Sequence, residues 1–328
     1  MEVARGHPEP KRLTSPVDSD RMQIDRRMFV KSSAAAALQT GPASAVGFAT
    51  GTYGMKSVPT REALSTLASI GYDGVELCLI PGWPTDPAKL SSGDRAGLRR
   101  MLSDSGLALP AFLESLPMIG TPEKRAYNLD RLKSAAALAH ELSASAPPCI
   151  DTVLGLKTSD WEGAKERMAG ELGDWAKVAE SSAVTIAIKP HAGQALNTPA
   201  KALWLLKQTG SGRIRVVYDY SHMSLEGFSL EQSLRELLPE TALVSVKDAQ
   251  GTAAHPEFLL PGEGSTDYAA YFRLLNTLRY RGFVAVEVSS MVFQKPGYDP
   301  IAAAHLCYQR LAPAFETAGL PRPAHKRS

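Results

Sequence analysis

The sequence predicts an α/β protein that folds as a single (β/α)8 TIM barrel. Eight apolar runs rich in β-branched residues alternate with helical segments of ten residues or more, and composition does not change again after residue 45. This alternation is typical of βαβ units in a parallel sheet, and eight such strands close a barrel. A doubly wound open sheet would need a glycine-rich phosphate loop after its first strand, but Gly47, Gly51 and Gly54 lack the dinucleotide-binding spacing.

The expected elements follow one another along the chain without a long gap. Strands are expected at 46–54, 74–80, 107–115, 149–156, 184–191, 214–222, 241–251 and 283–290. Helices are expected between them, at 60–70, 91–105, 122–145, 160–182, 198–209, 229–238 and 266–281. Gly106, Gly210 and Gly282 stand where helix C-caps are expected, because glycine adopts the left-handed conformation that ends a helix.

Length and composition narrow the class of protein. A chain of 328 residues accommodates one barrel of about 250 residues with extensions. The formal net charge of +2 gives no basic surface for nucleic acid, and no run of eighteen apolar residues predicts a membrane span. Cys78, Cys149 and Cys307 are widely spaced and predict small buried side chains instead of a disulfide or a metal site.

The first 45 residues differ from the rest of the chain. Arg26 and Arg27 are followed by a Phe, a Lys and an uncharged, Ala-rich segment, which resembles a twin-arginine export signal. We therefore expect a cleaved leader at 1–45, a barrel at 46–320, a disordered tail at 321–328, and a periplasmic or secreted protein. The alternative is a cytoplasmic protein whose disordered leader carries an arginine pair by chance.

Alternation along the strands predicts which side chains enter the barrel. Because successive side chains point to opposite faces, the β-branched positions of 184–191 face the helices, and Lys189 and His191 face inward. The same reasoning places six polar residues in one pocket, namely Glu76, Lys189, Asp219, Ser245, Lys247 and Glu287. Burying an unpaired charge costs several kcal/mol, so these groups are expected to pair, bind a metal or bind a substrate.

Five short motifs carry a resemblance to a known family. They are Tyr-Asp-Gly-Val-Glu-Leu at 72–77, Asp-Tyr-Ser-His at 219–222, Val-Lys-Asp at 246–248, Pro-Gly-Glu-Gly at 261–264 and Val-Glu at 286–287. In this order the chain resembles the xylose-isomerase-like TIM barrels, which include sugar phosphate isomerases and epimerases. The resemblance implies one Mn²⁺, Mg²⁺ or Co²⁺ ion held by Glu, Asp, His and Glu. It also implies proton transfer between carbons next to a carbonyl.

Two of the four implied metal ligands are exchanged in this chain. By resemblance, Asp219 and Glu287 match the second and fourth ligands, and His222 matches a histidine that usually contacts substrate. Lys189 stands where the family has Glu, and Ser245 stands where it has His. An ammonium group donates hydrogen bonds and cannot ligate a cation, so we expect either no cofactor or a weakly held divalent ion.

Lys189 leaves three interpretations open. Its ammonium could replace the metal in an internal salt-bridge cluster with Asp219 and Glu287. It could instead be an amine with a lowered pKa that acts as a proton shuttle or Schiff-base nucleophile. A shifted metal site could also remain, built from Asp219, Glu287, His191 or Glu76.

The leading functional hypothesis is isomerisation or epimerisation of a sugar or polyol carbonyl compound. The candidate catalytic residues are Glu287 as general base, Lys189 or Lys247 as stabiliser of the enediolate, and His222. The candidate substrate-binding residues are Glu76, His191, Trp83 and Glu114. The expected partner is a small sugar-like molecule, and the sequence does not specify an oligomer. The alternatives are a keto-sugar lyase or dehydratase and a non-catalytic carbohydrate-binding barrel.

Overall fold

Eight parallel strands close into one barrel in the computed structural model, which describes residues 45–156 and 158–323. The strands pair in the order β1-β10-β7-β6-β5-β4-β3-β2, which confirms the predicted (β/α)8 fold. Their bounds are β1 Gly47–Gly51, β2 Gly74–Cys78, β3 Ala108–Ser115, β4 Cys149–Val153, β5 Ile186–Ile188, β6 Ile214–Asp219, β7 Thr241–Val246 and β10 Phe283–Val286. Of the predicted leader, only Ala45 is described. Of the tail predicted as disordered, residues 321–323 are described, and here the prediction is wrong: the carbonyl oxygen of Pro321 accepts the backbone N–H of Val46 at 2.7 Å, and Arg322 pairs with Asp73 at 2.8 Å.

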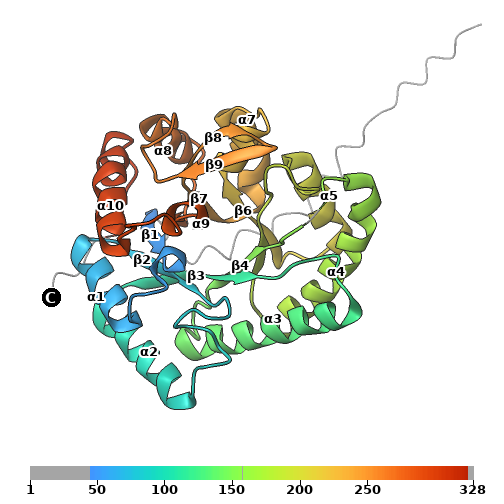
Figure 1. The fold of residues 1–328 in the computed structure, drawn as a ribbon, viewed down its shortest axis with the longest axis horizontal. Helices are drawn as coiled ribbons and strands as arrows, with labels where there is room; N and C mark the ends of the chain where they lie inside the picture. Colours follow the sequence, from blue (N-terminus) through green and yellow to red (C-terminus); the bar gives the residue numbers. More distant parts are fainter. Residues whose placement is uncertain (1–44, 157, 324–328) are drawn as a thin grey trace, which may run out of the picture. The chain divides into compact units, whose positions relative to one another are not determined.

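Helices surround the strands in chain order (Figure 1). They are α1 Thr60–Ile70, α2 Ser92–Ser105, α3 Pro122–Leu142, α4 Trp161–Ser181, α5 Pro199–Thr209, α7 Leu230–Leu237, α8 Tyr268–Thr277 and α10 Pro300–Thr317. Gly106 and Gly210 cap α2 and α5 in the left-handed conformation, as expected. The expectation for Gly282 is wrong: α8 ends at Thr277 with Leu278 as its C-cap, and Arg279 takes the positive φ of 56°.

Short elements after the strands were not predicted. They are the antiparallel hairpin β8 Asp248–Thr252 with β9 His255–Leu259, the helices α6 Tyr220–Leu225 and α9 Ser290–Phe293, and the 3₁₀ turn at Tyr53–Met55. The expected strand 241–251 therefore ends at Val246, and the chain leaves the barrel at Lys247. Asp248 stabilises this departure, because its Oδ2 accepts the backbone N–H groups of Gly262 (2.7 Å) and Gly264 (2.9 Å).

Two apolar layers confirm the predicted alternation. The larger layer lies between strands and helices and includes Phe48, Ile186 and Val284. The smaller layer fills the inside of the barrel with mostly small side chains: Ala49, Ala111, Cys149, Ala187, Val217, Leu243, Phe283 and Ala285. The three cysteines are buried and free. Among the described helices, none has the length and apolar character required to cross a membrane.

Candidate active site

Five charged side chains gather inside the carboxyl end of the barrel. Lys189 follows β5, Asp219 ends β6, Lys247 follows β7, Glu287 follows β10, and Asp151 lies within β4. Parallel strands bring their carboxyl ends to one edge of a sheet, so residues far apart in sequence meet there. The Glu287 side chain is 14% exposed, whereas the other four residues are at most 3% exposed. Glu287 is therefore the carboxylate of this cluster that an entering molecule reaches.

The two lysines share the carboxylates between them. Glu287 Oε2 lies 2.6 Å from Lys189 Nζ, and Glu287 Oε1 lies 3.2 Å from Lys247 Nζ. Lys189 Nζ also lies 3.1 Å from Asp151 Oδ2, and Lys247 forms a short ion pair with Asp219. An ammonium group has three N–H donors, so each lysine keeps one for a further acceptor. We call these five residues the lysine cluster.

The lysine cluster keeps its central groups charged. Burial alone lowers the pKa of Lys189, but Asp151 and Glu287 outweigh it and hold that pKa well above its ordinary value. Burial likewise raises the pKa of Glu287, but Lys189 and Lys247 bring it below its ordinary value. The geometry supports the salt-bridge interpretation of Lys189, with one correction: its second carboxylate is Asp151, and the expected partner Asp219 pairs with Lys247 instead. The same geometry disfavours a Schiff-base nucleophile, which needs a neutral amine.

Glu76 lies beside the lysine cluster but differs from it chemically. It points inward from β2 and is 3% exposed. Burial, with the nearby charge of Asp151, raises the pKa of Glu76 to about 8, so the group carries a proton at neutral pH. Burial also raises the pKa of Asp151, to about 6. Among the described residues, Glu76 Oε1 has no hydrogen-bond partner.

Two stacked histidines form one wall of the site. The ring centroids of His191 and His222 lie 4.3 Å apart. His191 Nδ1 donates to the carbonyl oxygen of Lys189 at 2.8 Å, and His222 Nδ1 accepts the backbone N–H of Ala192 at 3.3 Å. Burial and the nearby lysines lower the pKa of His191 to about 4 and that of His222 well below its usual value. Both rings are thus neutral, and His222 carries its proton on Nε2.

Aromatic side chains lie near the opening of the barrel. Tyr53 stacks on Trp83 with centroids 5.4 Å apart, and Phe293 of α9 packs edge-on against Tyr53 at 4.9 Å. Burial and the charge of Glu287 raise the pKa of Tyr53, so its hydroxyl lies within the field of the site. Phe258 of the hairpin contacts the His222 ring at 4.8 Å. Apolar ring faces beside polar groups are suited to binding sugars.

Alternation does not bring every candidate residue into the pocket. Glu114 points outward from β3, is fully buried, and pairs with Arg131 of α3. The expectation that Glu114 lines the mouth therefore disagrees with its position. Ser245 does face inward, in register with Asp219. Asp151 was missed, although the same alternation rule applied to the run 149–153 would have placed it inside with Cys149.

The donor set does not fit the divalent ion that the family resemblance implies. No group of three or more His, Cys, Asp or Glu side chains in the described ranges is arranged to hold a metal. Asp219 and Glu287 both contact ammonium groups instead, and Lys189 stands where a carboxylate ligand would be needed. A cation placed among these groups would face two positive charges at close range.

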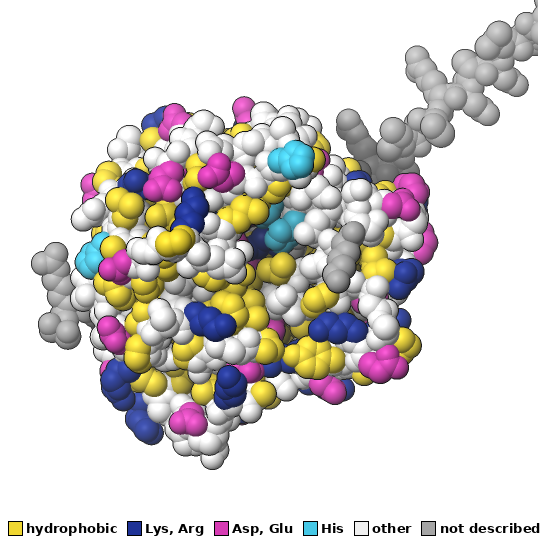
Figure 2. All heavy atoms as spheres, in the orientation of Figure 1, with side chains coloured by type: hydrophobic (Ala, Val, Ile, Leu, Met, Phe, Trp, Pro, Cys, Tyr) yellow, Lys and Arg dark blue, Asp and Glu magenta, His cyan; other side chains and the backbone are white. Residues whose placement is uncertain are grey.

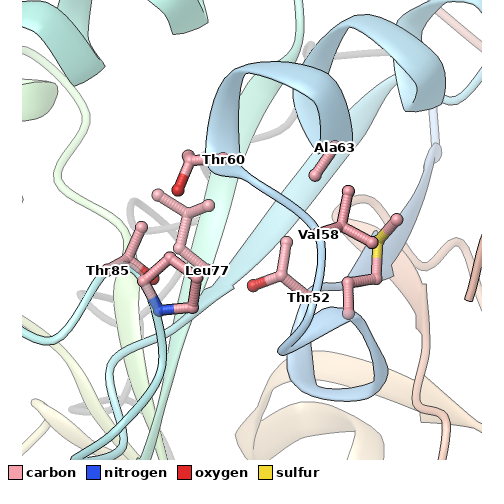
Figure 3. A pocket seen from close by; sticks show the side chains of 8 residues that line it. Thr52, Val58, Thr60, Ala63, Leu77 and Thr85 are labelled. Carbon is pink, nitrogen blue, oxygen red and sulfur yellow. The ribbon is translucent and has the colours of Figure 1, made fainter.

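The barrel face in Figure 2 is hollowed near its middle, and His, Lys or Arg side chains are visible inside the hollow. A separate cavity of about 10 Å³ lies beside the start of α1, lined by the residues in Figure 3. That volume corresponds to about one water molecule. It is too small for a sugar. The carboxyl end of the barrel is the candidate binding site, because the charged side chains of the lysine cluster and the partly exposed Glu287 meet there.

The sequence matches the model of one known protein family over most of its length. The family model described as "Xylose isomerase-like TIM barrel" matches residues 64–308. A search of curated proteins finds no match.

Three solved structures show the same fold. An L-ribulose 3-epimerase is 21% identical, with a TM-score of 0.66 over 84% of this chain and 96% of its own. The probable 3-DHS dehydratase AsbF from Bacillus anthracis is 15% identical, with a TM-score of 0.65 over 81% and 99% of the two chains. The IOLI protein with a bound zinc atom is 17% identical, with a TM-score of 0.66 over 84% and 98%.

Proposed function

Because this chain belongs to the xylose isomerase-like TIM barrel family, we propose that it is an isomerase or epimerase. Its proposed reaction moves a proton on a carbon next to the carbonyl of a sugar or polyol. The epimerase among its structural neighbours supports an enzyme of this kind. The proposal concerns chemistry that this chain's own residues carry out, since they do not fit the divalent ion of the family pattern.

The proposal depends on one observation: the Glu287 carboxyl group is partly exposed and contacted by two ammonium groups, which favour its ionised form. A carboxylate in this setting is a weak base. The same ammonium groups, however, stabilise the negative oxygen that forms when the substrate loses its proton. Lys189 and Lys247 each retain an N–H donor for that oxygen. Proton abstraction by Glu287 and stabilisation of the enediolate by the lysines therefore form one step.

His222 supports the same step from the side of the pocket. Its Nε2–H is buried and has no hydrogen-bond partner among the described residues, so it is available to a substrate hydroxyl or carbonyl. His191 offers the complementary group, because its Nδ1–H is bound to Lys189 and its Nε2 accepts. One donor and one acceptor side by side match a diol or hydroxyketone.

Solvent exchange tests the proposal. L-Ribulose, D-fructose and D-tagatose are incubated with the protein in D₂O containing EDTA, and deuterium next to the carbonyl is followed by NMR and mass spectrometry. We expect incorporation by the parent protein and a loss of about 10³-fold in Glu287→Gln, because a general base contributes on that order. If the parent protein incorporated deuterium only after a divalent metal was added, the lysine-based step would be contradicted.

A keto-sugar lyase is the second candidate, favoured by Glu76, a buried carboxyl group with no ion pair among the described residues. A carboxylic acid beside the substrate can donate to a leaving hydroxyl after the same first proton abstraction. The solvent-exchange samples distinguish the two, since a lyase releases a dehydrated product. A protein that binds these ketoses with no exchange and no product would instead be a carbohydrate-binding barrel.

We also propose that the mature protein acts outside the cytoplasm on unphosphorylated sugars. Only the twin-arginine pattern of the leader supports this, and the leader lies outside the described residues. Fractionation of cells that express the full chain, with Arg26→Lys/Arg27→Lys as control, tests it. Full-length protein in the cytoplasm of both strains would contradict it.

A further inference from the structure

Glu76 and Glu287 lie on either side of a position that has no side chain. Gly51 of β1 pairs with Glu76 of β2, and Thr50 pairs with Val286 of β10, so Glu287 follows on the other side. A Cβ atom at Gly51 would lie 2.8 Å from Glu76 Oε2, closer than real Cβ contacts allow. The absence of a side chain at residue 51 therefore leaves room for the Glu76 carboxyl group.

The two carboxyl groups have opposite surroundings. Glu287 is in contact with two ammonium groups, whereas no ion pair of Glu76 occurs among the described residues. The charged groups facing Glu76 are Asp151 from β4, Lys189 after β5, Lys247 after β7 and Glu287 after β10. A buried carboxyl group without a counter-ion favours its protonated form, whereas the two ammonium groups against Glu287 favour the carboxylate. Paired carboxyl groups in contrasting environments commonly divide the roles of acid and base.

A structural role does not account for the position of Glu76. A carboxyl group that serves only the fold normally satisfies its oxygens with hydrogen bonds. Glu171 of α4 does so by accepting the backbone N–H of Ile119 at 3.0 Å. Glu76 Oε1 is buried and unpartnered, although it lies inside a pocket of polar groups. An oxygen in that state is available to a bound molecule.

We propose that Glu76 is a second catalytic residue, the acid that completes the proton transfer begun by Glu287. This inference rests on the proposed function. Glu287 breaks the C–H bond next to the carbonyl and keeps the proton, and the electron pair passes to the carbonyl oxygen as an enediolate. Glu76 then gives its proton to the enediolate carbon and becomes a carboxylate. Exchange with solvent restores both groups before the next turnover.

The experiment separates proton abstraction from product formation. Glu76→Gln is incubated with L-ribulose, D-fructose and D-tagatose in D₂O, and deuterium in the recovered ketose and formation of the new sugar are both measured. We expect exchange within about threefold of the parent, because Glu287 is intact, and at least about a hundredfold loss of product. Equal losses of exchange and product, or unchanged product formation, would overturn the role of Glu76.

Two further variants keep this test informative. Gly51→Ala displaces the Glu76 carboxyl without changing its chemistry, so it should lower product formation about tenfold and leave exchange nearly intact. It also decides the question if Glu76→Gln does not fold. Glu171→Gln removes a buried glutamate outside the pocket and should change neither rate. Absence of all exchange in the parent would reject the proposed function itself, whereas full product formation by Glu76→Gln rejects only this inference.

Discussion

Two buried ion clusters in this barrel differ in how completely they are satisfied. Outside the strands, Arg131 of α3 pairs with Asp86 at 2.7 Å and with Glu114, and it also donates to the carbonyl oxygen of Leu79. Only Arg131 Nε lacks a hydrogen-bond partner there. Inside the barrel, the lysine cluster retains free N–H donors and lies beside the unpartnered oxygen of Glu76.

The difference indicates what each cluster does. The Arg131 cluster joins α3 to β3 and to the loop after β2, and its acceptors come from the protein itself. The lysine cluster has the same need for pairing, but the neighbouring Glu76 Oε1 has no hydrogen-bond partner among the described residues. A buried polar group without a partner is costly, so unsatisfied groups that collect in one place indicate a ligand. The first cluster stabilises the fold, and the second is the one that we propose for chemistry.

Restoring the family's metal ligands should change the lysine cluster most. In Lys189→Glu/Ser245→His a carboxylate and an imidazole join Asp219 and Glu287, so we expect a divalent ion to bind with a Kd of about 1 µM or tighter, about 8 kcal/mol. Elemental analysis after incubation with Mn²⁺, Mg²⁺, Co²⁺ and Zn²⁺ measures this. Ser245→His alone keeps the ammonium and should bind none. One ion per chain in the parent would contradict the pairing described here.

Loss of the arginine should damage the fold without affecting the chemistry. Arg131→Met leaves Asp86 and Glu114 as buried carboxylates without a cation, so the free energy of unfolding should fall by about 3–5 kcal/mol. Turnover per folded molecule should be unchanged. Urea denaturation and active-site titration measure the two quantities. Arg125→Met, which removes an exposed pair with Asp174, is the control and should cost under about 1 kcal/mol.

The pH dependence of the free energy of unfolding should distinguish Glu76 from an ordinary carboxylate. Folded Glu76 keeps its proton up to about pH 8, whereas in the unfolded chain it loses the proton near pH 4.5, so its contribution to stability falls as pH rises between these values. Glu76→Gln lacks this titration. As pH rises from about 4.5 to about 8, its free energy of unfolding should therefore increase relative to that of the parent by a few kcal/mol. A constant difference between pH 5 and pH 9 in urea denaturation would refute the assignment.

The hairpin should have the smallest effect. Phe258 lies 4.8 Å from the His222 ring and 5.0 Å from Lys247 Nζ, so Phe258→Ala removes an apolar cover and a cation–π contact. We expect KM for the ketose to rise several-fold, about 1 kcal/mol, with little change in kcat. Glu257→Ala, an exposed neighbour on the same strand, is the matched control. A large fall in kcat would instead give Phe258 a direct part in the reaction.

Local rules account for the part of the site that the sequence predicted. Side chains alternate in every strand, and four of the strands have one clear apolar face, so Lys189, Asp219, Lys247 and Glu287 were assigned inward correctly. The run 107–115 is apolar on both faces, so alternation could not show that Glu114 points outward. The hairpin was missed because only one residue separates the end of β7 from the start of β8, so the pattern predicted a single strand over 241–251.

The sequence by itself determined the closed barrel and the direction of most of its polar side chains, because periodicity and strand count are local and repeated. Only the tertiary structure decided which ammonium contacts which carboxylate and which carboxyl keeps its proton. Those outcomes depend on strand register around the closed barrel, on the absence of a side chain at Gly51, and on burial that different parts of the chain create together. Distances of this kind are set by packing, and no single segment encodes them.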